Sequence, residues 1–392
     1  RGYDSAGLAV YDGEKINVIK TKGKIKNLRA LCHDGADLKG TVGIGHTRWA
    51  THGAPSYVNS HPHMNSGENI SVVHNGIIEN YMALKKRLER KGYTFQSETD
   101  TEVVAQLMDY YFDGDILSTV AKVLTRVEGS YALGILCTDN PDEIIAAKKD
   151  SPLIVGLSDE GNFIASDIPA VLKYTRKVYI LEDGEIVRLT KDGVSIYNME
   201  LEPVEKEVTE ILWDVSAAEK GGYEHFMMKE IHEQPKAVRD TINPSIKDGE
   251  IVIEELHMTP QQLRQIQRIF IVACGSAYHA GVTGKYVIEQ LSRIPVEVDL
   301  ASEFRYRNPI LDEHCLVIII SQSGETADTL AAMREAKKHG VRTLAVVNVV
   351  GSSIAREADD VLYTWAGPEI AVATTKGYTS QTMHSMPGCS RS

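Results

Sequence analysis

The sequence lacks any apolar run of the ~20 uninterrupted residues that a membrane-spanning helix requires, and it has no basic-then-apolar start of the kind that directs secretion. Basic residues are in deficit: 42 Lys and Arg stand against 54 Asp and Glu, which gives a net charge of −12 at pH 7. An acidic chain is a poor candidate for binding nucleic acid or an anionic membrane through its overall field. We therefore expect a cytoplasmic protein that binds neither nucleic acid nor membrane.

Cysteine is also scarce, and its arrangement excludes two common scaffolds. The five cysteines are an odd number without a CxxC pair: Cys32, Cys137, Cys274, Cys315 and Cys389. This pattern argues against a disulfide framework or a structural zinc site and fits a reducing cytosol. Four histidines near one another lack the HExxH or carboxylate-flanked spacing of a metal site, so we expect no metal: His46, His52, His61 and His63.

Three regions of the 392-residue chain differ in pattern. Residues 1–193 read as short β-prone segments with turns and two amphipathic helices, at 80–91 and 101–111, which predicts an α+β domain rich in antiparallel strands. Residues 194–259 are acidic and we interpret them as an interdomain connector. In residues 260–392 apolar strands alternate with helices, which predicts a doubly wound parallel α/β domain. The strands predicted in this last region are 269–273, 296–300, 316–320, 343–347 and 360–363.

Two loops of the third region have the composition of a phosphate cradle. Gly275-Ser276 follows the first of its strands, and the run Ser321-Gln322-Ser323-Gly324-Glu325-Thr326 follows the third. Parallel sheets bind ligands beyond the carboxyl ends of their strands, and the free N–H groups of a helix start complement a phosphate dianion. Neither loop matches GxGxxG or GxxxxGK[ST], which excludes the dinucleotide and P-loop interpretations.

These loops predict a division of roles. Three hydroxyls, those of Ser321, Ser323 and Thr326, are expected to bind one phosphate, while Gln322 and Ser276 reach the hydroxyls of a sugar. The alternative is that the serines only cap the helices that follow, since capping and phosphate binding share the same geometry.

In the first region, polar side chains gather beyond apolar strands. Arg48 offers a bidentate fork for a carboxylate, and Asp100 is an acceptor suited to an ammonium, so together they can hold the two charged groups of an amino acid. The Asn75 amide and the Gly76 N–H have the composition of an oxyanion hole.

Simpler interpretations of the same residues stay open at this point. Ser97 or Thr99 fits an N-cap whose capping box is completed by Glu102. Asn75-Gly76 is also typical of a plain turn, and Arg48 of a structural ion pair. Composition alone does not choose among them.

Nine short runs of the sequence together resemble the family of glutamine–fructose-6-phosphate aminotransferases, also called glucosamine-6-phosphate synthases. The amidotransferase runs alone are shared by several class II glutamine amidotransferases, and the sugar-isomerase (SIS) runs narrow the resemblance to this family. The matching runs are 1–8, 46–53, 61–63, 74–80, 97–102, 163–167, 222–235, 301–307 and 321–329.

The resemblance implies an N-terminal-nucleophile hydrolase domain of αββα layering followed by a SIS domain. It implies transfer of ammonia from glutamine to fructose 6-phosphate, giving glucosamine 6-phosphate, with no metal or organic cofactor and with a homodimer as the full-length form. The glutamine-binding residues would be Arg48, Trp49, Thr51, His52, Gly76 and Asp100, with Asn75 and Gly76 as the oxyanion hole. The sugar-phosphate residues would be Gly275, Ser276, Ser321, Gln322, Ser323, Thr326, Val372 and Ala373.

Both ends of the sequence depart from the family pattern. Family members begin with a nucleophilic cysteine about two dozen residues before the run that starts here at Arg1, and none of the five cysteines replaces it by motif. From about Thr382 the sequence leaves the pattern, which continues in the family into a second SIS lobe with further catalytic residues. We expect a fragment that at most binds fructose 6-phosphate weakly and is inactive as written.

Two other hypotheses remain. The first is a non-catalytic sugar-phosphate-binding or regulatory protein with a degenerate amidotransferase domain. The second is a phosphoribosyl-transferring amidotransferase, which predicts a diphosphate loop with paired acidic residues where this chain has Ser-Gln-Ser-Gly-Glu-Thr.

Overall fold

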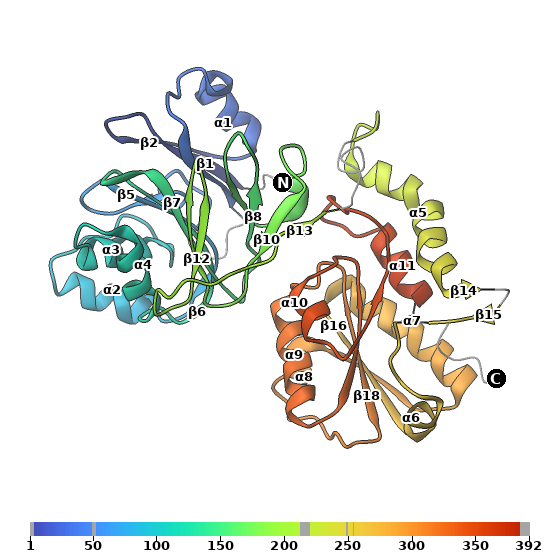
Figure 1. Ribbon diagram of the computed structural model, residues 1–392. Helices are drawn as coiled ribbons and strands as arrows, with labels where there is room; N and C mark the ends of the chain where they lie inside the picture. Colours follow the sequence, from blue (N-terminus) through green and yellow to red (C-terminus); the bar gives the residue numbers. More distant parts are fainter. Residues whose placement is uncertain (1–3, 49–51, 212–219, 248–249, 254, 385–392) are drawn as a thin grey trace. The chain divides into compact units, whose positions relative to one another are not determined.

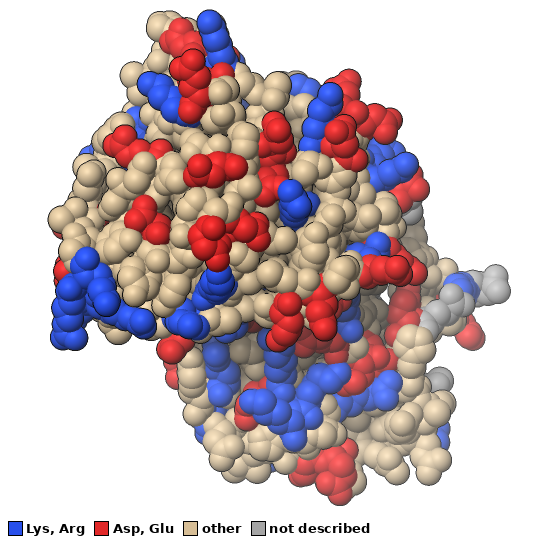
Figure 2. Space-filling view, turned by 60° about the vertical axis from the view of Figure 1, so that its left-hand side comes forward, with Lys and Arg blue, Asp and Glu red and all other residues tan. Residues whose placement is uncertain are grey.

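The computed structural model describes residues 4–48, 52–211, 220–247, 250–253 and 255–384. The chain divides into two compact units, residues 1–212 and 213–392. The first is built on antiparallel sheets and the second on a parallel sheet (Figure 1). None of the helices within the described residues is both long and apolar enough to cross a bilayer. On the face seen in Figure 2, acidic and basic side chains are interspersed.

The strands of the first unit form three antiparallel sheets. A six-stranded sheet has the order β12-β11-β7-β6-β5-β4, and two smaller sheets have the orders β2-β1-β3 and β13-β10-β8-β9. The strand bounds are β1 Ser5–Tyr11, β2 Ile16–Lys22, β3 Val42–Arg48, β4 His63–Met64, β5 Ile70–Ile78, β6 Gly129–Cys137, β7 Asn140–Lys149, β8 Ile154–Leu157, β9 Phe163–Ala165, β10 Lys177–Ile180, β11 Ile186–Thr190, β12 Val194–Tyr197 and β13 Thr209–Glu210.

The six-stranded sheet is buried on both faces. Helices cover one face, where α3 contributes Val104 and Met108 and α4 contributes Val120 to a core shared with β5, β6 and β7. The two smaller sheets cover the other face, through separate clusters that include Ile44 of β3 and Val155 of β8. The helices are α1 Ile25–Leu31, α2 Tyr81–Glu89, α3 Glu102–Tyr111 and α4 Ile116–Leu124. This stacking of helices, sheet and sheet confirms the predicted α+β class.

The second unit is a five-stranded parallel sheet with helices on both faces, as the alternating pattern predicts. Helices α8, α9 and α10 pack on one face through residues such as Phe304, Met333 and Ile354, while α7 packs on the other through Ile288. The sheet order is β17-β16-β18-β19-β20, with β16 Arg268–Ala273, β17 Val296–Leu300, β18 Cys315–Ser321, β19 Arg342–Val347 and β20 Asp360–Tyr363. Its helices are α5 Phe226–Ile242, α6 Pro260–Gln265, α7 Gly275–Ser292, α8 Ala301–Phe304, α9 Ala327–Lys338, α10 Ser353–Glu357 and α11 Lys376–His384.

The predicted connector, residues 194–259, is shared between the units. Strand β12 pairs with β11 and β13 pairs with β10, both within the first unit. Helix α5 belongs to the second unit, as does the short hairpin of β14, Ile246–Lys247, and β15, Glu250–Ile251. Of the tail predicted to be aberrant, residues 382–384 continue α11, and residues 385–392 lie outside the described part of the chain.

Two simpler interpretations of the first region are wrong. Asn75 and Gly76 lie inside β5, paired with Ala132 and Tyr131 of β6, so they form no plain turn. Helix α3 begins after Thr101 without a side-chain cap, so the predicted capping box does not form. The Glu102 carboxylate instead accepts hydrogen bonds from the backbone N–H groups of residues 96 and 97, because it is buried beside that loop.

Candidate functional site

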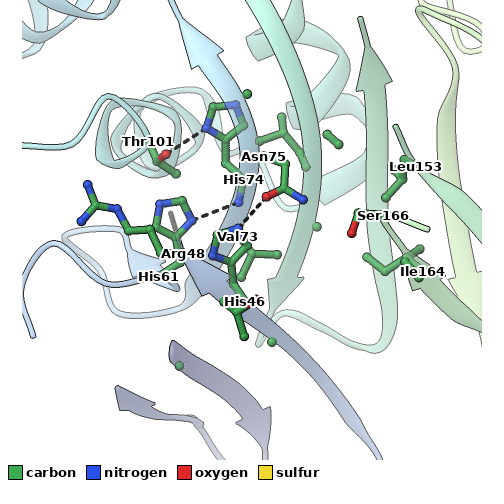
Figure 3. A pocket seen from close by; sticks show the side chains of 18 of the residues that line it. His46, Arg48, His61, Val73, His74, Asn75, Thr101, Leu153, Ile164 and Ser166 are labelled. Carbon is green, nitrogen blue, oxygen red and sulfur yellow. Dashed lines mark hydrogen bonds between the residues drawn. The ribbon is translucent and has the colours of Figure 1, made fainter. Parts of the chain in front are cut away.

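A cavity of about 730 Å³ opens between the two smaller sheets of the first unit. Strands β5 and β6 form its floor, β3 supplies Arg48 on one side, and β9 supplies Ile164 on the other. In Figure 3 the histidines and Arg48 lie on one side of the view and Leu153, Ile164 and Ser166 on the other, and the Arg48 guanidinium points away from this second group. The volume lies within the ~300–1,000 Å³ typical of small-molecule pockets. Of the residues predicted for glutamine, Arg48, Asn75, Gly76 and Asp100 all line it.

The Asn75 side chain is oriented by His46. The Nε2 atom of His46 lies 2.8 Å from Oδ1 of Asn75, and since an amide oxygen only accepts, Nε2 carries the hydrogen. With its oxygen engaged, the Asn75 amide points its nitrogen away from His46, towards the side of the cavity where Ser166 and Ile164 lie (Figure 3). A donor aimed into the cavity is what an oxyanion hole requires.

Gly76 has a backbone that only glycine tolerates. Its φ is +131°, and a Cβ at this position would lie 2.2 Å from the carbonyl oxygen of Ser130 on the neighbouring strand. The close approach of β6 therefore fixes the residue type beside Asn75. The two groups predicted as the oxyanion hole are adjacent on β5 and both line the cavity.

The Arg48 guanidinium is buried and only partly engaged. Nη2 donates to the carbonyl oxygens of His52 and Gly53, the latter at 3.1 Å. Nη1 is buried and has no hydrogen-bond partner among the described residues. Burial lowers the pKa of this guanidinium, with opposing contributions from the carboxylates of Asp4 and Asp100. A buried cationic donor with one free edge can pair with a carboxylate.

Asp100 lies at the base of the same wall and is 4% exposed. One carboxylate oxygen accepts a hydrogen bond of 2.8 Å from the Ile78 N–H of β5. The hydroxyl oxygen of the next residue, Thr101, lies 2.9 Å from Nδ1 of His74. These bonds join the start of α3 to β5, so the predicted ammonium acceptor is held against the strand that carries Asn75.

His46, His61, His63 and His74 pack together at the cavity. This is a different set from the four histidines weighed as metal ligands in the sequence, which included His52 in place of His74. The rings of His46 and His61 stack with centroids 4.3 Å apart, and those of His61 and His63 meet edge to face at 4.9 Å. The His74 N–H donates to Nδ1 of His61 at 3.2 Å. Within the described residues, no three His, Cys, Asp or Glu side chains are placed to share a metal ion. The cluster acts as packing and as a set of orienting hydrogen bonds.

The cluster is neutral. Burial lowers the pKa of His46 to about 4, against a rise from its bond to Asn75. Burial lowers the pKa of His61 and His63 well below the ordinary value, reinforced by the neighbouring histidines at His61 and by the charges of Lys20 and Arg48 at His63. Burial also lowers the pKa of His74. The signal that could have found the cluster is the recurrence of histidine in the patterns His-x-Arg, His-Pro-His and His-Asn-Gly, in or directly before strands β3, β4 and β5.

One further described residue predicted for glutamine, His52, does not line the cavity. His52 is held through its carbonyl by Arg48, and its ring meets that of Tyr81 edge to face at 5.5 Å. It is absent from the cavity wall. Trp49 and Thr51 lie outside the described residues. Among the described cysteines, none lines the cavity, and burial raises the pKa of Cys137 to about 11.

In the second unit, the hydroxyl-rich run follows β18 at the carboxyl end of the parallel sheet. The Ser321 hydroxyl lies 3.1 Å from that of Thr326 and accepts the Gly324 N–H at 3.1 Å. The Ser323 hydroxyl accepts the Glu325 N–H at 3.2 Å. Gly324 has φ +67°, and a Cβ there would lie 2.0 Å from Oγ of Ser352. The loop is therefore a tight turn with three hydroxyls on it.

Simple capping does not account for these hydroxyls. Helix α9 has Thr326 at its N-cap position and α7 has Cys274, and neither makes a side-chain capping bond. The N–H groups at the start of α9 are left without a side-chain acceptor of this kind. A helix start with uncapped N–H groups and neighbouring hydroxyls can accept an anion.

The second predicted loop is adjacent to the first. Ala273 of β16 pairs in register with Ile320 of β18, so Gly275 and Ser276 begin α7 beside the Ser321 turn. Thr329 of α9 donates to Sγ of Cys274 at 3.6 Å, which ties the two helix starts together. Both Gly275 and Ser276 are exposed.

The remaining sugar-phosphate candidates lie on the segment between β20 and α11. Val372 is 69% exposed and Ala373 is also exposed. Gln322 connects the loop of residues 321–326, which we call the hydroxyl loop, with α11. Its Oε1 accepts from Gln381 at 3.2 Å, while its Nε2 is buried without a partner among the described residues. A Cβ at Gly377 would lie 2.6 Å from the Gln322 amide carbon, so α11 packs directly on this side chain.

Comparisons with known proteins agree with the two architectures. Residues 46–173 match the glutamine amidotransferase domain family, and residues 262–386 match the SIS domain family. The antiparallel first unit and the parallel second unit are thus an amidotransferase domain and a SIS domain, as the sequence predicts.

Relatives cover nearly the whole chain. The chain is 62% identical to the protein named glutamine–fructose-6-phosphate aminotransferase (isomerizing) of Caldanaerobacter subterraneus subsp. tengcongensis, over 97% of this chain and 63% of the relative. Two further relatives have the same name. Identity is 60% in Clostridium acetobutylicum, over 97% of this chain and 63% of the relative. Identity is 49% in Thermus thermophilus, over 97% of this chain and 62% of the relative. The chain therefore spans about 63% of the length of the curated relatives it matches.

Proposed function

This chain belongs to the family of glutamine–fructose-6-phosphate aminotransferases, and we propose that it binds glutamine in its first unit and fructose 6-phosphate in its second. These are the binding steps of glutamine-dependent amination and isomerisation of fructose 6-phosphate to glucosamine 6-phosphate. The observation that carries the proposal is the presence, in one chain, of two chemically distinct sites. One has a buried cation, a carboxylate and an amide donor, and the other has hydroxyls at uncapped helix starts.

Glutamine fits the first site group by group. Its α-carboxylate would pair with the free edge of Arg48, and its α-ammonium with the Asp100 carboxylate. The side-chain carbonyl oxygen would then lie between the Asn75 amide and the Gly76 N–H, where negative charge develops during attack on the amide. Because the histidines around it are neutral, they would orient these groups without adding charge. The ammonia released there would be the nitrogen source for the sugar.

Fructose 6-phosphate fits the second site in the same way. Its phosphate would accept hydrogen bonds from Ser321, Ser323 and Thr326 and from the first N–H groups of α9. The sugar would reach Gly275 and Ser276 on one side and Gln322 on the other, with Val372 and Ala373 beyond. No Lys or Arg is needed, because helix N–H groups and hydroxyls provide the donors.

Calorimetric titration of the chain with each ligand tests the proposal. We expect glutamine and fructose 6-phosphate each to bind with a stoichiometry of one, whereas asparagine and unphosphorylated fructose bind much more weakly. Absence of fructose 6-phosphate binding at millimolar concentration would overturn the proposal for the second unit. Sugar-phosphate binding without any glutamine binding would instead favour a non-catalytic sugar-phosphate-binding protein.

We also propose a cytoplasmic location and, for the full-length form, a homodimer. The supporting observation for the first is the set of scattered cysteines without a CxxC pair, of which the four described are free thiols. Cell fractionation and light scattering on the full-length protein test the two statements separately.

A further inference from the structure

Helix α5 presents three polar side chains to one segment of the second unit. Glu230, Glu233 and Gln234 are spaced at i, i+3 and i+4, which places them on one face of the helix. Each bonds to a residue between β20 and the middle of α11, more than a hundred positions later in the sequence. This segment, residues 369–379, contains Val372 and Ala373, and we call it the sugar segment.

Glu230 makes the most buried of these contacts. It is 2% exposed, and one carboxylate oxygen accepts two backbone hydrogen bonds, from the N–H of Ile370 at 2.6 Å and from that of Ala371 at 3.0 Å. Bonds from backbone N–H groups to a carboxylate are short and stronger than neutral ones. The two amide groups they hold immediately precede Val372 and Ala373.

Two further contacts hold the other half of the sugar segment. Lys376 is 2% exposed and its Nζ lies 2.7 Å from the Glu233 carboxylate, while the Thr379 hydroxyl donates to Gln234 at 2.6 Å. Glu369 closes the loop on itself, since its carboxylate accepts the N–H groups of Thr375 at 2.8 Å and Gly377 at 3.2 Å. The segment is thus fixed at both ends, and Glu230 holds the two residues that directly precede Val372.

The sugar segment continues into the residues that contact Gln322. Gly377 packs against the Gln322 amide and Gln381 donates to it at 3.2 Å. The hydroxyl loop also has an anchor outside the sugar segment: the Glu325 carboxylate accepts the Ser353 N–H at 2.7 Å and its hydroxyl at 2.8 Å. Displacing the sugar segment would therefore leave the phosphate-binding hydroxyls in place.

We propose that Glu230 is a positioning residue that sets the main chain of Val372 and Ala373 against the sugar of fructose 6-phosphate, while the hydroxyl loop holds the phosphate independently. This inference rests on the proposed function of the second unit. Glu230 touches no reacting atom; it acts through the backbone of Ile370 and Ala371. A binding site loses affinity for its ligand when the residues that hold the contacting groups in place are removed, even though the contacting groups themselves are unchanged.

The affinities of Glu230 variants for two ligands, fructose 6-phosphate and glycerol 3-phosphate, test the proposal. Glu230→Met removes the acceptor and keeps the side-chain volume, and Glu230→Gln keeps an acceptor oxygen for the two N–H groups. Burial raises the pKa of Glu230, so the neutral amide is a mild change at this position. We expect Glu230→Met to weaken fructose 6-phosphate binding about tenfold and Glu230→Gln to stay within about twofold of the parent chain. We expect neither to change the affinity for glycerol 3-phosphate, which has the phosphate ester but no sugar, measured by competition.

Lys236→Met is the matched control, because Lys236 lies on the same helix with its side chain 73% exposed. Unchanged fructose 6-phosphate affinity in Glu230→Met overturns the inference, and so does an equal loss for both ligands, which would indicate general damage. If Glu230→Met gives no cooperative melting transition, Glu230→Asp withdraws the acceptor by one methylene and should give an intermediate, sugar-specific loss; an affinity equal to that of the parent chain would overturn the inference. Absence of fructose 6-phosphate binding by the parent chain would count against the proposed function itself.

Discussion

The cavity of the first unit and the hydroxyl loop of the second are assembled in opposite ways. The cavity brings together side chains from separate strands, and the His46–Asn75 bond alone joins residues 29 positions apart. The hydroxyl loop is one continuous run in which Ser321 bonds to Thr326, five positions away. A site built from distant residues depends on the packing of the whole unit. A site built from one turn depends mainly on its local backbone.

The two sites also differ in how they provide charge. The first contains a buried guanidinium and a carboxylate among histidines whose pKa is lowered by burial, so a ligand with charged groups of both signs would match it. The second uses hydroxyls and backbone N–H groups at helix starts, which suit a dianion. Substitutions that act on one site and spare the other are the direct way to test this contrast.

The largest effects should come from glycines at which a Cβ has no space. Gly76→Ala and Gly324→Ala place a Cβ 2.2 Å from the Ser130 carbonyl oxygen and 2.0 Å from Oγ of Ser352. We expect each to destabilise its own unit by about 3 kcal/mol or more. Gly92→Ala and Gly340→Ala are matched controls with positive φ and nothing within 4 Å of the Cβ, and they should cost about 1 kcal/mol. Hydrogen exchange followed unit by unit measures this, and equal losses in test and control variants would contradict it.

The pH dependence of stability should differ between the units. Burial lowers the pKa of His46 to about 4, so below pH ~6.5 the unfolded chain takes up a proton that the folded unit does not. The contribution of His46 to the free energy of unfolding is complete above this pH. It declines as the pH falls towards 4, by about 3 kcal/mol for His46 alone. Neighbouring His61 and His63 act in the same direction.

The second unit contains a group whose pKa shift changes stability with pH in the opposite direction. Burial raises the pKa of Glu230, so the folded unit keeps that proton longer than the unfolded chain, and its contribution falls as the pH rises above about 4.5. Between pH 4.5 and 6.5 we therefore expect the first unit to gain stability with pH more steeply than the second. Hydrogen exchange corrected for the intrinsic pH dependence compares the two, and His61→Gln should flatten only the first slope. Parallel slopes would contradict the assignment.

Binding should be separable by single substitutions. Arg48→Met removes the buried guanidinium, and we expect glutamine affinity to fall about 30-fold, which corresponds to roughly 2 kcal/mol, without change for fructose 6-phosphate. Ser321→Ala should weaken fructose 6-phosphate about fivefold without change for glutamine. Arg87→Met, at an exposed position on α2, is the control for loss of a cation. Titration of both ligands against each variant checks this, and a loss of both ligands in one variant would show that the sites are not independent.

An effect as small as that of Ser321→Ala is expected for the orienting bond in the first site. His46→Leu removes the donor to Asn75, and we expect glutamine affinity to fall about fivefold because the amide is free to turn. His46→Gln can supply a donor of its own and should lose less. His33→Leu, at an exposed ring, is the control. An equal loss in the Leu and Gln variants would place the effect in packing and not in the orientation of Asn75.

Sequence patterns predicted the local features of both units well. Apolar runs predicted the parallel strands β16 and β18, and the residues at their carboxyl ends were recognised as a possible anion site because a helix must follow within a few residues. Asn-Gly is typical of turns, but pairing with β6 keeps the strand that carries Asn75 extended to Ile78. Pairing across strands is a long-range effect, and local propensity does not contain it.

The sequence by itself determined the two architectures, through the periodicity of apolar residues, and the contact between Ser321 and Thr326 inside the hydroxyl loop. Tertiary structure alone decided that His46 turns the Asn75 amide, that Arg48 holds the carbonyls of residues 52 and 53, and that Glu230 holds the backbone of Ile370, 140 positions away. The physical reason is that hydrogen bonds between distant residues form only after hydrophobic packing has brought their elements together. A sequence shows the donors and acceptors but not their partners.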